Sequence, residues 1–581
     1  MIGGAAAFMS KKWARNIALT VSIPAFILSF FVFAMPGSSS MVLNLRSYAL
    51  SSGIFMAASL ITLLVIIYSG RWMREHERIN EYYSYILLTL GAAAGVLFGN
   101  DLLTLLMFWG MTGITLYMLI GIGGPKAAYA AQKSLVIVGG SDALLIMGIG
   151  LILPLTRNLQ MGIARIPIEG APATLAFICF VIAAFAKAGV MPFHSWVTDS
   201  SECAPVPVMA FLPASLDKLM GIYLLFRTCN DIFVLTPGSF PSLALMTAGS
   251  LTIIIAVTAA LLQHDIKKLL AFHAVSQVGY MVLGIASATP IGIAGGLFHM
   301  FNNAIYKSCL FLTAGSIEKQ SGSTNVDRLG GLSKAMPYTF IFAGIAALSI
   351  SGIPPFNGFV SKWMIYQGII NLMAYGPLWV LWLATAMFGS ALTLASFIKF
   401  IHAVFLGQKG ANSANVVECP RSMWLPAGIL AVICIVFGVF AFIPLNYVIL
   451  PSTPFLSFIG AFDPVLTTSL LLLGLLAGAG IYMLHVKIPS VSTEPYIGGE
   501  VIPDEITKVS GGKFYNTIKD YGPINSICRV AEKKYLDLYD TTIFACMKAH
   551  KFLSSLYDGF LGNYISWMLI GGVLIWLILS L

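Results

Sequence analysis

The sequence predicts an all-α polytopic membrane protein. Of its 581 residues, 58% are hydrophobic and only 10% are charged, and the mean hydropathy is +0.87. Soluble domains carry roughly 25% charged residues. The apolar runs are about 20 residues long, as membrane-spanning helices require, whereas strands of a membrane barrel would alternate over about 10 residues. These observations predict one helical bundle in a lipid bilayer.

The apolar runs predict about 15 spanning helices. They lie at residues 17–35, 47–69, 82–99, 102–122, 134–155, 172–198, 206–227, 240–262, 268–287, 290–316, 337–374, 377–406, 424–450, 464–485 and 562–581. With the N-terminus inside, the opposite set of loops contains little besides Arg46, Arg157 and Arg165. The inside loops contain the other basic loop residues: Lys11, Lys12, Arg15, Arg71, Arg74, Arg78, Lys126, Lys133, Lys267, Lys268, Lys319, Arg328, Lys334, Lys409 and Arg421. This asymmetry predicts a cytoplasmic N-terminus and an external C-terminus. The net charge of +9 comes from these loops and does not indicate a nucleic-acid partner.

Residues 487–561 form a polar region between the last two expected spans. Apolar positions between Ile527 and Tyr539 recur mostly at steps of three or four, which predicts one apolar helical face. Two interpretations fit this pattern. The region is either a small solvated cytoplasmic domain or an amphipathic, lateral helix along the bundle, anchored by the span 562–581.

The eight cysteines are scattered and form no CxxC pair. Their spacing does not match a zinc or iron–sulfur site, and neither a P-loop nor a GxGxxG motif after a strand is present. We therefore expect no cofactor or metal in this chain. The N-terminus has basic residues but no small-residue cleavage signature after the first apolar run, so we expect no cleaved signal peptide.

Ionisable residues interrupt five of the expected spans. They are Asp142, Lys187, Asp217, Lys218, His299, Lys307 and Lys362. A charge within a span costs several kcal/mol and usually faces a partner or a wet cavity. A snorkelling lysine or a hydrogen-bonded histidine would explain any one of these residues. This explanation is weaker for a whole set of such residues that comes from five spans. Buried lysines can exchange protons near neutral pH, so the set suits a proton relay. Lys399 and His402 lie near a span end, where snorkelling is expected.

Two expected spans contain helix breakers at membrane depth. Pro192 follows Lys187 and precedes His194 in "AFAKAGVMPFHSW", and Pro354 and Pro355 precede the lysine of "PPFNGFVSKW". Irregular backbone at this depth is tolerated where it is buried in protein or lines a cavity. Two similar breaks, five spans apart, predict two inverted repeats of five helices. The expected regions are 1–81 for the N-terminal spans, 82–227 and 228–406 for the repeats, 407–486 for two further spans, 487–561 and 562–581.

At these residues the chain resembles the antiporter-like subunits shared by respiratory complex I, Mrp-type sodium/proton antiporters and energy-converting membrane-bound hydrogenases. The resemblance covers about residues 82–405. Its motifs are "KAGVMPFHSWVTDSSECAPVPV", "QHDIKKLLAFHAVSQVGYM", "FHMFNNAIYKSCLFLTAGSIEK" and "GGLSKAMPYTFIFAGIAALSISGIPPFNGFVSKW". The resemblance implies a role in proton or sodium movement for matching residues: Lys187 in the input half-channel, Lys218 on the central axis, His299 and Lys307 at the centre of the second half, Lys362 near the exit, and Asp142 at an acidic position of some members.

The chain departs from the family pattern at two of these positions. The family glutamate that pairs with the first lysine falls in "FWGMTGITLYM", where Gly110 takes its place. We expect Asp142 to replace that carboxylate. Asp217 is next to Lys218 and points about 100° away from it around a helix, which makes it a poorer direct partner. The second family histidine is Asn303 in this chain.

Within the family, "FLPASLDKLMGIYLL" and "FLTAGSIEKQSG" are most similar to the large membrane subunit of Ech-type hydrogenases or formate hydrogenlyase. This resemblance implies a non-catalytic, ion-translocating subunit in the inner membrane of a prokaryote. Other membrane subunits and a peripheral redox arm with iron–sulfur and nickel–iron centres would be its partners. The alternatives are a subunit of complex I, a subunit of an Mrp-type antiporter, and a structural subunit with a vestigial channel.

Overall fold

The computed structural model describes most of the chain. The described residues are 1–453 apart from 36, 38, 41–43, 162–164 and 414, isolated positions between 469 and 483, and 537–580 apart from 557 and 558. The chain divides into two units, Met1–Asn516 and Thr517–Leu581.

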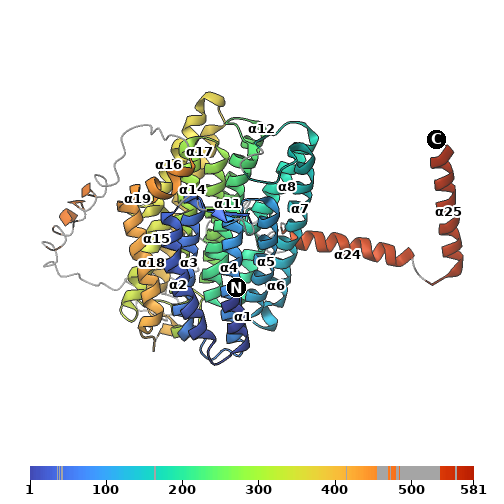
Figure 1. Ribbon diagram of the computed structural model, residues 1–581. Helices are drawn as coiled ribbons and strands as arrows, with labels where there is room; N and C mark the ends of the chain where they lie inside the picture. Colours follow the sequence, from blue (N-terminus) through green and yellow to red (C-terminus); the bar gives the residue numbers. More distant parts are fainter. Residues whose placement is uncertain are drawn as a thin grey trace, which may run out of the picture. The chain divides into compact units, whose positions relative to one another are not determined.

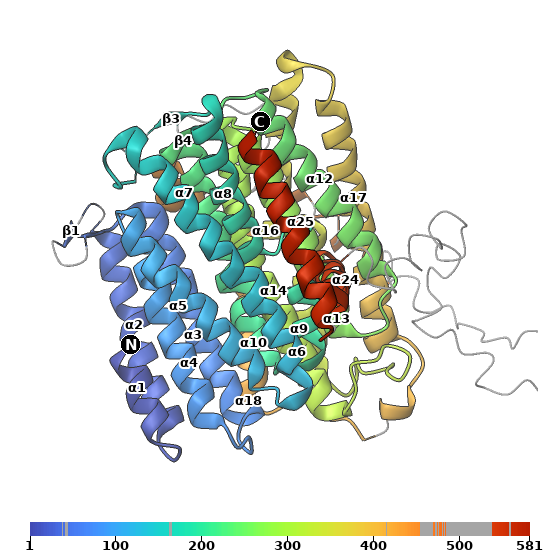
Figure 2. The same cartoon turned by 90° about the vertical axis from the view of Figure 1, so that its right-hand side faces the viewer.

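The first unit is a bundle of helices packed side by side (Figures 1 and 2). The α-helices are α1 (Ile2–Met9), α2 (Ala14–Ala34), α3 (Ala49–Trp72), α4 (Ile79–Phe98), α5 (Leu102–Gly121), α6 (Ala128–Ser134), α7 (Gly140–Thr156), α8 (Gly170–Ala188), α9 (Ser195–Cys203), α10 (Val206–Phe211), α11 (Asp217–Arg227), α12 (Phe240–Leu261), α13 (Ile266–Ala286), α14 (Pro290–Ser321), α15 (Pro337–Ser351), α16 (Asn357–Ile370), α17 (Trp379–Ile401), α18 (Arg421–Val439) and α19 (Phe442–Pro444). Short strands pair in the loops: β1 (Ser39–Ser40) with β2 (Leu45–Arg46), and β3 (Ile166–Pro167) with β4 (Phe233–Val234).

The expected all-α membrane fold is confirmed. In the described part of the chain, 12 helices are long and apolar enough to cross a membrane. The 32-residue α14 and the interrupted pair α15–α16 correspond to two more expected spans. The expected span 464–485 lies outside the described residues except for isolated positions. Helix α1 was not predicted, because its apolar run is too short to span; it packs against α2 and α4.

Both predicted helix breaks are present. Helix α8 ends before Gly189 (φ 74°), and α9 begins after a turn that contains Pro192. Helix α15 ends before Gly352 (φ 80°), and Pro354 and Pro355 precede α16. Glycine adopts this left-handed conformation without steric cost, and proline after it prevents the helix from continuing. The boundaries of the two repeats stay a prediction.

Two π-helical segments interrupt helices that carry candidate residues. Leu212–Leu216 separates α10 from α11, directly before Asp217, and Leu135–Gly139 separates α6 from α7, shortly before Asp142. The hydropathy pattern gave no sign of either segment. π-Helical turns occur frequently at functional sites because they change the direction of the side chains that follow.

Close backbone contacts hold the centre of the bundle together. A Cβ on Gly249 of α12 would lie 2.9 Å from the carbonyl oxygen of Gly279 on α13. A Cβ on Gly295 of α14 would lie 2.8 Å from the backbone nitrogen of Ile365 on α16. Small residues let helices approach closely in a membrane. Helix α14 is consequently buried without interruption from Ile291 to Ile317.

The second unit contains α24 (Leu538–Leu556) and α25 (Leu561–Ser580). Helix α25 has the length and hydropathy of a membrane span, as expected. Helix α24 confirms helical structure in the end of the polar region. The predicted apolar face from Ile527 lies mostly outside the described residues, and its role as a lateral helix stays a prediction.

Candidate functional site

Six of the predicted site residues are buried in the bundle. Lys187, Asp217, Lys218, His299 and Lys307 are 0% exposed, and Lys362 is 2% exposed. They come from α8, α11, α14 and α16, whereas Asp142 on α7 is only partly buried. A buried charge is unfavourable unless protein groups compensate it, so the contacts of each residue matter.

Lys187 joins three helices. Its Nζ donates a 2.5 Å hydrogen bond to Oγ1 of Thr112 on α5 and lies 3.7 Å from Oδ1 of Asp217 on α11. It also lies 5.2 Å from the centre of the Trp109 ring, within the range of a cation–π interaction. The carboxylate in direct ion contact with Lys187 is therefore that of Asp217. The sequence had suggested Asp142 first for this role, and the structure corrects that preference.

Asp142 lies over the part of α5 where a glutamate is missing. A Cβ on Gly110 would be 3.9 Å from Oδ2 of Asp142, and one on Gly113 would be 3.7 Å away. The Asp142 carboxylate also interacts electrostatically with Lys187. Asp142 thus places a negative charge beside Gly110, although not in the direct contact that Asp217 makes.

Lys218 lies at the first helix break. Its Nζ has no hydrogen-bond partner among the residues that the structure describes, and it is 5.4 Å from the centre of the Trp196 ring. A Cβ on Gly189 would be only 3.2 Å from this nitrogen. The indole of Trp196 donates a 3.0 Å hydrogen bond to the carbonyl of Ala186, which connects α9 to the end of α8. The break therefore leaves room for an ammonium group.

Lys307 lies between α13 and α14. Its Nζ donates a 2.9 Å hydrogen bond to the carbonyl of Leu270, and its charge interacts with that of Lys218. His273 of α13, which the sequence analysis did not single out, is buried and lies 2.7 Å from Oγ of Ser396. His273 interacts electrostatically with Lys307. Its position in the motif "AFHAVSQVGYM" is the only sequence signal that could have revealed it.

His299 and Lys362 lie near the second helix break. Nδ1 of His299 is 2.9 Å from Oγ of Ser361, and its Nε2 is 3.1 Å from Oε1 of Gln277. Lys362 donates a 2.9 Å hydrogen bond to the carbonyl of Ile350, near the end of α15. Its Nζ also lies 4.8 Å from the centre of the Tyr280 ring. Backbone freed by the break thus binds the lysine.

The remaining predicted residues support this arrangement in different ways. Asn303, at the position of a family histidine, donates a 3.3 Å hydrogen bond to the carbonyl of Ala214 in the π-helical segment before α11. His194 lies in the first break, where its ring centre is 6.4 Å from that of Phe272.

Two lysines occupy positions that differ from the expectation. Lys399 is 1% exposed and donates hydrogen bonds to the carbonyls of Leu261 and Gln263, so it binds the end of α12 instead of snorkelling. Lys133, expected in a loop, is 0% exposed and forms a 2.9 Å ion pair with Asp199 of α9. Among the described residues, no group of three or more His, Cys, Asp or Glu side chains could hold a metal ion.

Comparisons with known proteins identify the family. Residues 99–393 match the model described as "NADH:quinone oxidoreductase/Mrp antiporter, TM". The chain is 34% identical over 417 residues to Na⁺/H⁺ antiporter subunit A1 of Staphylococcus epidermidis, covering 67% of this chain and 51% of that protein. The subunit A1 of Staphylococcus haemolyticus is 33% identical over 420 residues, with 68% and 52% covered. The chain therefore spans about half the length of these curated relatives.

Solved structures share the fold. A chain of the membrane-bound sulfane sulfur reductase, an archaeal respiratory membrane complex, superposes with a TM-score of 0.81 and 25% identity, covering 100% of this chain and 98% of that one. A chain of the Mrp complex from Dietzia sp. DQ12-45-1b superposes with a TM-score of 0.70 and 22% identity, covering 77% and 94%.

These matches agree with the family expected from the motifs, but they give no support to the hydrogenase subgroup. The curated relatives are Na⁺/H⁺ antiporter subunits, and the chain matched from end to end belongs to a sulfane sulfur reductase complex. The chain belongs to the NADH:quinone oxidoreductase/Mrp antiporter family.

Proposed function

We propose that this protein is an ion-translocating, antiporter-like subunit that moves protons along its buried lysines. The observation that carries the proposal is the sequence of interacting groups from α8 to α16. Lys187 contacts Asp217, and the charge of Lys218 interacts with that of Lys307. A protonated His273 would be repelled by the charges of both Lys307 and Lys362, which extends this charge coupling toward the second break. Each group lies in the interior, where the effective dielectric constant is low and charges affect one another strongly.

Protons suit this site better than sodium ions. Ammonium groups repel a metal cation, and the lysines outnumber the carboxylates among the buried residues of the site. Two of the lysines also occupy backbone carbonyls that could otherwise bind sodium: Lys307 binds Leu270 and Lys362 binds Ile350. A lysine can accept or release a proton at its own amine, whereas a sodium ion would need oxygen ligands from the protein.

Asp142 and Asp217 together take the place of the family glutamate in this proposal. Asp217 supplies the direct counter-charge to Lys187, and Asp142 supplies a second negative charge beside Gly110. Movement of either carboxylate changes how strongly a proton is held at Lys187, which gives a means of gating.

We further propose that the subunit works in a redox-driven membrane complex in the cytoplasmic membrane of a prokaryote, with its N-terminus inside. The end-to-end match to the sulfane sulfur reductase chain, at 25% identity, supports this choice. Partner subunits in a peripheral arm would hold iron–sulfur centres. The second candidate is an Mrp-type antiporter without a redox partner, which the 34% identity to subunit A1 supports.

Two experiments test these proposals. Lys187→Ala and Lys218→Ala should each abolish proton pumping by the complex in liposomes while assembly is retained. Lys126→Ala, at an exposed position of the short 3-10 helix Pro125–Ala127, should pump normally. Normal pumping by both site variants would support the structural subunit with a vestigial channel.

Metal analysis of the purified complex tests the choice of complex. Iron without nickel agrees with a sulfane sulfur reductase type of complex. Iron with nickel would restore the hydrogenase interpretation, and the absence of both would favour the Mrp-type antiporter.

A further inference from the structure

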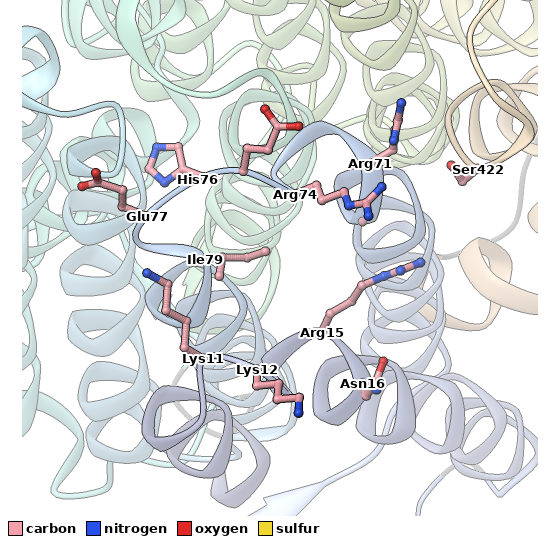
Figure 3. A pocket seen from close by; sticks show the side chains of 12 residues that line it. Lys11, Lys12, Arg15, Asn16, Arg71, Arg74, His76, Glu77, Ile79 and Ser422 are labelled. Carbon is pink, nitrogen blue, oxygen red and sulfur yellow. The ribbon is translucent and has the colours of Figure 1, made fainter.

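A basic cavity that contains none of the proposed pathway residues lies where the turn between α1 and α2 meets the loop between α3 and α4. Figure 3 shows the side chains that line it. Its volume is about 850 Å³. The basic side chains that line it come from the turn between α1 and α2, from α2, and from the end of α3 and the loop after it: Lys11, Lys12, Arg15, Arg71 and Arg74. None of these five forms an ion pair with another described residue.

The cavity has an excess of positive charge. Glu75 and Glu77 are the acidic residues that line it, so the five basic residues exceed the acidic ones by three. Burial and the neighbouring Arg78 lower the pKa of His76 from its ordinary value, so this histidine adds little to the positive charge at neutral pH. Ser422 of α18 and Asn16 of α2 add uncharged hydrogen-bonding groups.

Gly70 makes room for one of the arginines. A Cβ on Gly70 would lie 2.4 Å from Nε of Arg15 and 2.7 Å from Nη2. The guanidinium of Arg15 therefore lies directly against the backbone of α3, where it faces the cavity (Figure 3). An arginine held in this way presents donors in a fixed orientation that suits a phosphate group.

A second cavity of about 280 Å³ lies between α2, α3 and α18, each of which also contributes to the basic cavity, and α14 and the chain after α18 complete its walls. It is lined almost entirely by apolar side chains, including Phe26 and Phe30 of α2, Leu60 of α3 and Phe437 of α18. Phe26 is 11 residues beyond Arg15, or about 16 Å along the helix axis. This matches the hydrocarbon thickness of one leaflet, about 15 Å. Trp13, which is 55% exposed, lies where an aromatic residue at the membrane interface is expected.

We propose that an anionic phospholipid binds along α2, α3 and α18, with its phosphate in the basic cavity and an acyl chain directed toward the apolar cavity. A soluble phosphate compound shares the headgroup chemistry, but it would make no use of the apolar cavity. Basic pockets between transmembrane helices on the cytoplasmic side are suited to anionic lipid headgroups.

Native mass spectrometry of the delipidated, intact complex tests the proposal. The probe is dioleoyl phosphatidylglycerol, with dioleoyl phosphatidylcholine as the neutral comparison and glycerol phosphate as the soluble competitor. The cavity variant carries Lys11→Gln, Lys12→Gln and Arg15→Gln. The matched control carries Lys126→Gln, Lys319→Gln and Lys334→Gln, three exposed lysines outside the cavity.

We expect the cavity variant to bind phosphatidylglycerol about a hundredfold more weakly, because each basic residue near an anionic lipid contributes roughly a fivefold factor. The control variant should keep the wild-type affinity. Gly70→Ala retains every charge but displaces Arg15, so it should also weaken binding. This variant distinguishes a site that depends on the position of Arg15 from a simple effect of net charge.

Three results would overturn the proposal. Equal weakening in the cavity and control variants would indicate a non-specific charge effect. Equal binding of the neutral lipid, or full competition by glycerol phosphate, would exclude an anionic lipid as the preferred ligand. Loss of partner subunits from the cavity variant and from Gly70→Ala would identify the cavity as a subunit contact.

Discussion

Asp217→Asn removes the counter-charge of Lys187 with almost no change in shape. The distance between Lys187 Nζ and Asp217 Oδ1 is 3.7 Å, and both side chains are 0% exposed. At an effective dielectric constant of about 20, two unit charges at this distance attract each other by about 4 kcal/mol. If the transfer step needs the charge at Lys187, the loss of this attraction slows translocation by up to about a thousandfold.

The assay is proton uptake by liposomes that contain the complex, followed with a pH-sensitive dye and normalised to electron transfer. The matched control is Asp231→Asn, which removes a carboxylate from the Arg227–Asp231 ion pair near the end of the same helix. Asp231 is 24% exposed and lies outside the proposed pathway, so this variant should pump at the wild-type rate.

A double mutant separates loss of the pathway from loss of stability. Removing one partner of a buried ion pair costs about 3–5 kcal/mol because the other charge is left uncompensated. Lys187→Gln combined with Asp217→Asn removes both charges, so it should be more stable than either single variant but still fail to pump. If the Asp217→Asn variant retains at least half of the wild-type rate of proton pumping, this reasoning is refuted.

Three further predictions follow from the contacts described above. Asp142→Asn should lower proton pumping in liposomes. Adding Gly110→Glu should restore pumping, because the new carboxylate would lie beside position 142. Failure of this rescue would show that a carboxylate at position 110 cannot replace Asp142. Gly358→Ala should lower the thermal unfolding midpoint of the complex, because the new Cβ would clash with the Ser349 carbonyl oxygen. Such overpacking costs about 1–3 kcal/mol. Gly344→Ala should leave the midpoint unchanged, because no described atom lies near the Cβ position of Gly344. The pKa of His76, measured by NMR of labelled protein in nanodiscs, should lie below its ordinary value of 6.5, because burial and Arg78 disfavour the charged imidazole. The unfolded chain then binds this proton more readily, so the contribution of His76 to stability is lost as the pH falls below 6.5. A measured pKa above 6.5 would contradict this prediction.

Much of the fold could be predicted because the membrane imposes strong rules on a sequence. A spanning helix needs about 20 apolar residues, and a charge within such a run is conspicuous. Proline near glycine marks an interrupted helix, which is why the breaks at Pro192 and Pro354 were correctly located. Burial of Lys187 and Lys362 followed from their position beside these breaks.

The pairing between helices could not be predicted in the same way. Lys187 and Asp217 meet because α8 packs against α11, and no local pattern encodes that contact. A π-helical turn adds a residue, which rotates the following side chains by about 100° relative to a regular helix. Periodicity therefore does not give the direction of Asp217, which directly follows such a segment. Lys133 was placed in a loop because helical structure begins before the apolar run does.

The shortage of carboxylates around the lysines has a consequence for how many protons the pathway holds. Lys218, Lys307 and Lys362 form no ion pair with a described residue, whereas Lys187 contacts Asp217. In a medium of low dielectric constant, each proton added to one of these sites opposes the addition of the next. Under the proposed mechanism the lysines are therefore protonated one after another. The number of protons in the pathway at one time is limited by repulsion between the charged lysines, and not by tight binding of a proton at any one of them.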